Sequence, residues 1–186
     1  MTDEELKQLV ASLAIAQQKT DEQIALNFKE VSKKFKETDK KIKEVSDLVG
    51  NIGKNQGFVA EEFFYNSLAE DPHLGSIRFD DIAKNEQKRR GKTEEEYDIV
   101  MTNGDAIGIV EVKYKAHESD LEKLERKMRN FKKLFPVYEK YKLYGAIASF
   151  HIYDEAKNEA LKRGFFVLQR SGKVVHTECG QDLLVL

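Results

Sequence analysis

Apolar and small side chains recur between residues 6 and 52 at alternating intervals of three and four, separated by lysine, glutamate, aspartate and glutamine. This is the seven-residue repeat of a coiled coil, with one four-residue insertion around residues 20–24. One helix cannot bury so narrow a seam, so a partner helix is required. The pattern predicts a self-association stalk over residues 1–52, with a lone helix folded back on its own domain as the alternative. The seam consists of Leu6, Leu9, Leu13, Ala16, Thr20, Ile24, Phe28, Val31, Phe35, Thr38, Ile42, Val45, Val49 and Ile52.

The pattern changes after three glycines, Gly50, Gly53 and Gly57, which interrupt the repeat and predict a hinge. From residue 57 to residue 186, short apolar runs predict an α/β domain in which a helix is followed by three strands, a helix and a strand (αβββαβ). The predicted elements are a helix at 58–68, an extended stretch at 75–83, a charged loop at 84–95, strands at 97–101 and 106–114, a helix at 119–135, a strand at 143–152, a helix that Asp154 caps and that ends before Gly164, and closing strands at 165–168 and 174–175.

Composition narrows the possible functions. The 186 residues carry a net charge of −2, so any contact with nucleic acid has to come from a local basic patch. The single cysteine, Cys179, excludes an internal disulfide and a cysteine-rich zinc site. There is no apolar run of about 18 residues and no signal-peptide pattern. We therefore expect a cytoplasmic protein without a membrane association.

One of five Glu-x-Lys triplets differs from the others in its surroundings. Glu111-Val112-Lys113 lies in an apolar predicted strand, whereas the other four lie in charged helices or loops. Charges within such a strand are costly unless they are paired or bound to metal. A salt bridge of purely structural function is the alternative interpretation of this triplet.

The turn before this strand predicts which side chains share its face. Asn103-Gly104 is typical of a two-residue hairpin turn. In that register Asp98 faces Ile109, and Glu111 is its diagonal neighbour on the same face as Lys113. Two carboxylates at this spacing can converge on one cation, and oxygen ligands favour Mg²⁺ or Mn²⁺. The lysine ammonium beside them can hold the attacking water or neutralise developing charge.

These residues resemble the motifs of the PD-(D/E)xK nuclease superfamily, in particular its archaeal Holliday junction resolvase and RecB-like branch. Its glycine, three residues and glutamate match Gly57 and Glu61, its aspartate before a hairpin matches Asp98, and its Glu-x-Lys matches Glu111 and Lys113. The following helix and strand correspond in order to residues 119–135 and 143–152. The resemblance covers residues 57–170 and excludes the stalk.

The resemblance implies a restriction-endonuclease-like core, a mixed central sheet flanked by helices. It also implies that Asp98 and Glu111 bind the metal with help from the Val112 carbonyl, that Lys113 is catalytic, and that Glu61 completes the acidic cluster. Two features depart from the family or stay open. Tyr97 stands where the family often has proline, and the lysine that relatives often carry on the next helix has several candidates, among them Lys123 and Lys127. Whether Glu61 or Glu62 faces the site is also open.

Two functions follow from these features. The first is a Mg²⁺-dependent deoxyribonuclease, an endonuclease rather than an exonuclease, made a homo-oligomer by the stalk. The alternative is a non-enzymatic coiled-coil interaction protein whose nuclease fold serves as a binding module. For either function, a charged loop before the Asp98 strand supplies the residues expected to meet the phosphates of nucleic acid. They are Lys88, Arg89, Arg90 and Lys92.

Overall fold

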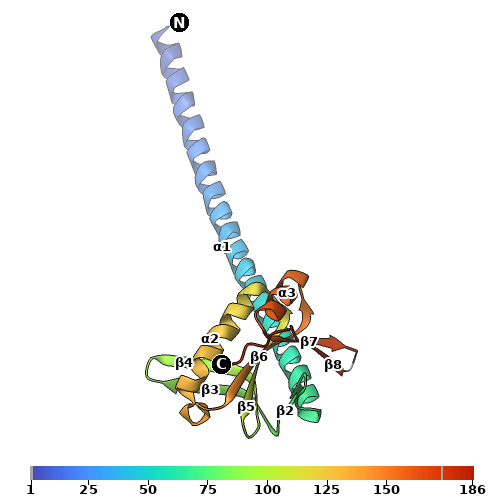
Figure 1. Cartoon of the computed structure of the whole chain (residues 1–186). Coiled ribbons are helices and arrows are strands. Elements are labelled where there is room, and N and C mark those ends of the chain that lie inside the picture. The colour runs from blue at the N-terminus through green and yellow to red at the C-terminus, as the bar shows by residue number, and fades with distance from the viewer. Residues whose placement is uncertain (1, 173) are drawn as a thin grey trace. The chain divides into compact units, whose positions relative to one another are not determined.

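The computed structural model describes residues 2–172 and 174–186. The chain divides into two compact units, residues 1–52 and 53–186. Helix α1 (Asp3–Glu70) supplies all of the described secondary structure of the first unit and continues into the second (Figure 1). It includes the three glycines that were expected to form a hinge, so these glycines do not end the helix, although each costs about 1 kcal/mol relative to alanine. The predicted helix at 58–68 is the last part of α1.

The first unit exposes much of the predicted apolar seam, and the side chains of Leu6, Leu9 and Ala16 lie outside the part that the structure describes. Nine large seam side chains are between 49% and 74% exposed in the single chain. An exposed apolar row of this length gains little stability from its own helix, because helix stability in proteins comes mainly from packing of the apolar face. The nine residues are Leu13, Ile24, Phe28, Val31, Phe35, Ile42, Val45, Val49 and Ile52.

The second unit is built on a mixed six-stranded sheet with the strand order β3-β4-β5-β6-β7-β8. The β5–β6 and β6–β7 pairs are parallel, and the others are antiparallel. Two short strands, β1 (His73–Leu74) and β2 (Ile77–Arg78), form a separate hairpin. The sheet strands are β3 (Asp81–Arg90), β4 (Thr93–Thr102), β5 (Ala106–Ala116), β6 (Lys142–Ile152), β7 (Phe166–Ser171) and β8 (Val174–Glu178).

Two apolar cores cover the two faces of this sheet. Helix α2 (Glu118–Leu134), the 3₁₀ turn η1 (Pro136–Tyr138) and helix α3 (Asp154–Lys162) connect the parallel strands. Helices α2 and α3 pack against one face, where Ile109 and Ile147 are buried. The last turns of α1 pack against the other face through Ala60, Phe64 and Leu68. The sheet is therefore the middle of three layers, as expected for the α/β class.

The charged segment 84–95 was predicted to be a loop, and this prediction is wrong. Strands β3 and β4 continue through it as a hairpin that turns at Gly91, whose φ is +62°. Most β3 side chains are exposed, so no alternation of apolar and polar residues marks this edge strand in the sequence. The start of α3 also differs from the prediction. Its N-cap is Tyr153, and Asp154 lies in the first turn, where a carboxylate interacts favourably with the helix dipole.

The hairpin between β4 and β5 forms in a register two residues away from the predicted one. Thr102 faces Ile107, and Gly104-Asp105 makes the turn between Asn103 and Ala106. The Asn103 side chain closes it, because its Oδ1 accepts hydrogen bonds from the backbone N–H groups of Asp105 (3.0 Å) and Ala106 (2.7 Å). A shift of two residues keeps every side chain on its face. Continuing this register places Asp98 opposite Glu111 rather than diagonal to it.

Candidate active site

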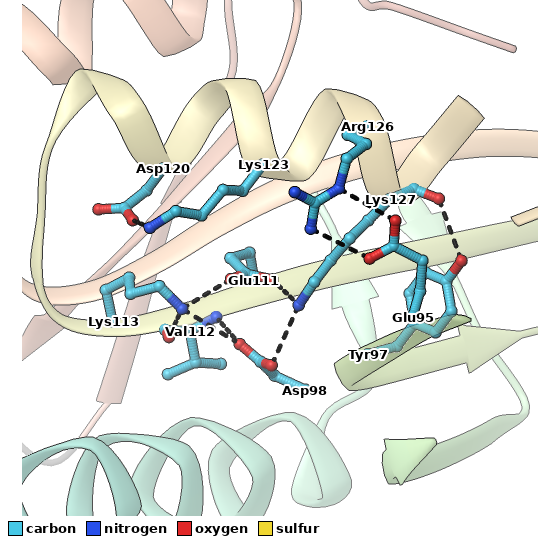
Figure 2. A network of polar contacts seen from close by, with 10 residues as sticks. All are labelled: Glu95, Tyr97, Asp98, Glu111, Val112, Lys113, Asp120, Lys123, Arg126 and Lys127. Atoms are coloured by element: carbon cyan, nitrogen blue, oxygen red, sulfur yellow. Dashed lines mark hydrogen bonds and ion pairs between the residues drawn. The ribbon is translucent and has the colours of Figure 1, made fainter. Parts of the chain in front are cut away.

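The central carboxylate of the site is Glu111, which is 3% exposed in the middle of β5. Both of its oxygens are bound by lysines (Figure 2). Oε1 accepts a hydrogen bond from Lys113 Nζ at 2.6 Å, and Oε2 accepts one from Lys127 Nζ. A carboxylate buried at this depth requires such partners, because an unpaired charge would be strongly destabilising there.

Asp98 on β4 completes the group that the hairpin was predicted to assemble. Its Oδ2 accepts a hydrogen bond from the Val112 backbone N–H at 2.7 Å and lies 3.7 Å from Lys113 Nζ. Its Oδ1 lies 3.4 Å from Lys127 Nζ. The structure therefore brings Asp98, Glu111 and Lys113 together on the sheet face that α2 covers, and the Lys127 ammonium bridges the two carboxylates.

Lys127 is the residue that the sequence left among several candidates. It is 8% exposed, whereas Lys123 forms an ion pair with Asp120 at 2.8 Å. The sequence contains a signal for this burial, since Lys127 lies three residues after Leu124 and four before Phe131, in phase with the apolar row of α2. The backbone carbonyl of Lys127 also accepts a hydrogen bond from Tyr97 Oη at 3.1 Å, which ties this turn of α2 to β4.

The two glutamates of α1 have different surroundings. Glu62 pairs with Lys84 on β3, whereas Glu61 lines an open cleft together with Val112 and Lys113. Burial, followed by the nearby charge of Asp98, raises the pKa of Glu61, and Lys113 opposes the shift. Glu61 is therefore the glutamate that faces the site.

Lys113 remains a cation at neutral pH. Burial lowers its pKa, but Glu111 and Asp98 outweigh this effect, so the pKa is raised above its ordinary value. Its ammonium also donates a hydrogen bond to the Val112 carbonyl at 2.9 Å. Lys113 can therefore stabilise negative charge or hold a water molecule, and it is not suited to accept a proton.

The donor atoms of the site are of the type that Mg²⁺ and Mn²⁺ bind. Asp98, Glu111 and the Val112 carbonyl offer oxygen atoms, and Mg²⁺ is commonly held by one or two carboxylates together with water. In residues 2–172 and 174–186, no three His, Cys, Asp or Glu side chains are grouped closely enough to hold a metal ion by themselves. The residues therefore fit a divalent ion that keeps several water ligands, and metal binding stays a prediction.

A second buried carboxylate lies on β4, three residues before Asp98, and was not identified from the sequence. Glu95 is 7% exposed and accepts hydrogen bonds from Arg126 Nε (3.0 Å), Arg126 Nη2 (3.1 Å) and Asn130 Nδ2 (2.8 Å). Burial raises its pKa, but the bonds from Arg126 and Asn130 outweigh burial and lower it overall. Figure 2 shows Glu95 and Arg126 beside the Lys127 network.

The basic residues expected to meet phosphates lie on the exposed β3–β4 hairpin rather than in a loop. Three of them already have partners. The Lys88 ammonium lies over the Phe135 ring, the Arg89 guanidinium lies 4.0 Å from Glu94, and the Arg90 guanidinium donates a hydrogen bond to the Lys133 carbonyl. Their contact with nucleic acid stays a prediction. The fourth of these basic residues is Lys92.

Tyr114, the residue after Lys113 on β5, has a side chain that is 40% exposed. The β4 ladder reaches β5 only as far as Val110, so the end of β5 beyond this point has one hydrogen-bonded neighbour, β6. The Tyr114 ring makes an edge contact with Phe150 of β6 at 5.6 Å between ring centroids.

No helix in the described part of the chain has the length and apolar character needed to cross a membrane.

The chain matches no protein-family model and has no significant match among curated proteins. Part of the chain is similar to solved structures, among them the following three. A repair endonuclease from Pyrococcus abyssi has a TM-score of 0.44 and 21% identity over 60% of this chain. The EndoMS-dsDNA2 complex has a TM-score of 0.42 and 14% identity over 60%. Protein VC1899 from Vibrio cholerae has a TM-score of 0.40 and 15% identity over 59%. The similar regions span 46%, 44% and 28% of those chains, respectively.

Proposed function

We propose that this protein is a metal-dependent nuclease that hydrolyses phosphodiester bonds of DNA, acting as an endonuclease. The observation that supports this most strongly is the convergence of Asp98, Glu111 and Lys113 on one face of the sheet, with both carboxylates sharing the Lys127 ammonium. Glu61 adds a third carboxylate at the adjoining cleft. The group contains three carboxylates and two ammonium groups, and this excess of negative charge favours a further cation.

Each residue has a defined task in this proposal. Asp98, Glu111 and the Val112 carbonyl would hold a Mg²⁺ or Mn²⁺ ion, which when bound activates water and stabilises charge on a phosphoryl group. Lys113, held protonated by its carboxylate neighbours, would neutralise the charge that develops on the scissile phosphate. Lys127 would keep the two carboxylates at a fixed separation. Glu61 would orient water at the open side of the site.

A cleavage assay tests the proposal directly. Wild-type protein is incubated with circular plasmid, linear duplex and single-stranded DNA, with Mg²⁺, with Mn²⁺ or with a chelator. We expect nicking or linearisation of the closed circle, which identifies an endonuclease, and loss of activity in the chelator. Asp98→Ala and Lys113→Ala should both be inactive while remaining folded by circular dichroism. Activity that survives both substitutions would overturn the assignment of the site.

One observation favours the alternative of a non-enzymatic binding module. Both oxygens of Glu111 are already bound by lysines of the same chain, as expected for a structural network of ion pairs. Calorimetric titration with Mg²⁺ and Mn²⁺ separates the two functions. A nuclease should bind the ion with an affinity that Asp98→Asn reduces. Absence of binding and of cleavage on both DNA and RNA would favour the module.

We further propose that residues 1–52 make the protein a homo-oligomer. Phe35 and Ile42, which lie one heptad apart on the seam, are 67% and 60% exposed in the single chain. Light scattering coupled to size exclusion should give a multiple of the 21.4 kDa chain mass. Combined Phe35→Lys and Ile42→Lys substitutions should reduce the mass to that of a monomer. Lys36→Gln with Lys43→Gln, one position outside the seam, should not. A monomeric wild type would refute the stalk.

A further inference from the structure

The open cleft beside the site has a volume of about 510 Å³. Its two walls are residues 53–61 of α1, at the start of the second unit, and the end of β5 beyond its pairing with β4. The lining residues include an aromatic ring, two lysine ammonium groups, a glutamate carboxylate and a glutamine amide, next to two glycines of the helix. They are Gly53, Gln56, Gly57, Glu61, Val112, Lys113, Tyr114 and Lys115.

The Tyr114 ring is the exposed aromatic surface of this cleft. Its contact with Phe150 is T-shaped, at an interplanar angle of 76°, so the two rings are not stacked face to face. Phe150 is itself held by Phe63 (5.1 Å between centroids) and Phe64 (5.6 Å). The tyrosine therefore has a rigid support, although 40% of its side chain is open to solvent. A supported and partly open ring is suited to stack against a planar ligand.

Lys113 and Lys115 flank Tyr114 along β5 and line the same cleft, and their side chains leave the strand on the face opposite to the Tyr114 ring. Lys113 reaches back to Glu111 and Asp98 in the site. Lys115 is exposed, and its ammonium lies 5.2 Å from the centroid of the Tyr153 ring. An aromatic ring together with two cations is the combination used to bind single-stranded nucleic acid, with stacking for the base and ammonium groups for the phosphates.

The opposite wall leaves room for a ligand. A Cβ atom added at Gly53 or Gly57 would meet nothing within 4 Å, so packing within the chain does not require glycine at either position. Each glycine nevertheless makes the helix about 1 kcal/mol less stable than alanine would. The space that these residues leave lies along the cleft that also contains Tyr114.

We infer that this cleft binds an unpaired stretch of the nucleic-acid substrate, with one base stacked on Tyr114 and the backbone between Lys113 and Lys115. A base within a duplex has both faces covered by its neighbours, so only an unpaired base can stack on the ring. The preferred substrate class is therefore DNA with a single-stranded segment next to the scissile bond. This inference rests on the proposed nuclease function, because the same cleft opens onto Lys113 and Glu61.

Binding to a fluorescent strand tests the inference without cleavage. The probe is a thymidine strand of about 16 nucleotides containing one 2-aminopurine, whose fluorescence falls on stacking, and it is titrated with full-length protein in a chelator. Wild type should quench the probe and bind it more tightly than the same sequence as a duplex. Tyr114→Ala should bind at least about fivefold more weakly, since one stacked base is worth about 1–3 kcal/mol. Tyr114→Phe should bind like wild type.

The matched control is Phe58→Ala, because Phe58 is an aromatic residue of the second unit that is 62% exposed and does not line the cleft. It should bind like wild type. Unchanged quenching and affinity in Tyr114→Ala would overturn the inference, as would an equal loss in Phe58→Ala. A tighter complex with duplex than with single strand would also overturn it. Lys115→Gln should reduce the slope of log affinity against log salt by about 0.7, as expected for one lost phosphate contact.

A substitution of Gly57 tests binding and folding separately, because its expected effects on affinity and on thermal stability have opposite directions. Gly57→Leu should raise the thermal stability, because the helix gains propensity and the added Cβ meets nothing within 4 Å. The same substitution should weaken probe binding by filling the cleft. Gly50→Leu is its control, since Gly50 also has nothing within 4 Å but does not line the cleft. A stabilised Gly57→Leu variant with full affinity would overturn the inference.

The plasmid assay distinguishes failure of this inference from failure of the proposed function. Metal-dependent cleavage with Tyr114-independent binding would leave a nuclease whose substrate follows another path. Tyr114-dependent binding without any cleavage would leave the strand-binding cleft in a protein that is not a nuclease.

Discussion

Two buried carboxylates, Glu95 and Glu111, lie on neighbouring strands beneath the same helix, and their surroundings differ in one essential respect. Glu95 is matched by one guanidinium, which binds both of its oxygens, and by the Asn130 amide. Glu111 shares its two lysines with Asp98, and Glu61 lies nearby. The first cluster has balanced charges, whereas the second has an excess of carboxylate and adjoins a cleft. Burial of a charge alone therefore does not mark a functional site, but excess charge beside an opening is a reason to propose one.

The largest difference between the clusters should appear in catalysis. Glu111→Gln and Glu95→Gln are the same chemical change at two buried positions. We expect Glu111→Gln to reduce the cleavage rate by about 10²–10³-fold, as removal of one preorganised electrostatic group commonly does. Glu95→Gln should leave the rate close to that of wild type. Initial rates of plasmid nicking measure both. Equal losses in the two variants would show that the clusters share one structural role.

The two clusters should also lose different amounts of stability when their cation is removed, because one cation is buried and the other is exposed. Lys127→Ala leaves the buried Glu111 and Asp98 with one ammonium fewer, and breaking a buried pair in this way costs about 3–5 kcal/mol. Arg126→Ala leaves Glu95 with Asn130 and costs about 1–3 kcal/mol, since the Arg126 side chain is itself 60% exposed. Urea denaturation gives both free energies of unfolding. A smaller loss for Lys127→Ala than for Arg126→Ala would contradict the assignment of Lys127 as the buried bridge.

The pH dependence of stability should follow the direction of the Glu95 shift. Its folded pKa is lowered from 4.5, so its stabilisation is complete above the unfolded value and is lost as the pH falls through the folded pKa. Compared with wild type, Glu95→Gln should be less stable by about 1.5 kcal/mol at pH 7. The difference should disappear in acid below the folded pKa. Thermal denaturation from pH 7 downward tests this, and a constant difference would refute it.

Glu61 should show the opposite sign and the smallest effect. Its folded pKa is raised above 4.5, so its charged form destabilises the fold above that folded pKa, and the penalty is absent below pH 4.5. Glu61→Gln should therefore stabilise the fold at neutral pH, by less than about 1 kcal/mol in the free energy of unfolding, and raise the melting temperature. In acid it should have no effect. The same variant should cut DNA more slowly. A drop in stability at pH 7 would mean that Glu61 makes a favourable contact in the fold.

The part of the site that could be predicted from the sequence consists of residues that lie close together along the chain. Asp98, Glu111 and Lys113 were predicted to share a face because strand alternation and a hairpin turn relate them over a short stretch of chain. The predicted register was off by two residues, since Asn103 was assigned to the turn itself and instead closes it with its side chain. An error of two residues keeps each side chain on its face, so the prediction that the three side chains share a face depends on strand alternation and not on the exact turn.

Other features depend on contacts that no local pattern encodes. Lys127 is distinguished from Lys123 only when α2 packs over Glu111, and Glu61 from Glu62 only when α1 packs against the sheet. The β3–β4 hairpin was missed because its edge strand is exposed and highly charged. The exposure of Tyr114 depends on where β4 stops pairing with β5, which strand alternation does not encode.

By itself, the sequence of this protein determined the heptad seam, the α/β class of the domain and the strand that carries Glu111 and Lys113. Each of these depends on periodicity within a continuous segment, where backbone geometry fixes which side chains point the same way. The tertiary structure alone decided which lysine bridges the carboxylates, which glutamate faces them, and that the end of β5 forms one wall of a cleft with α1. Those results depend on the packing of segments distant in the chain, where burial and charge pairing select among residues that are locally equivalent.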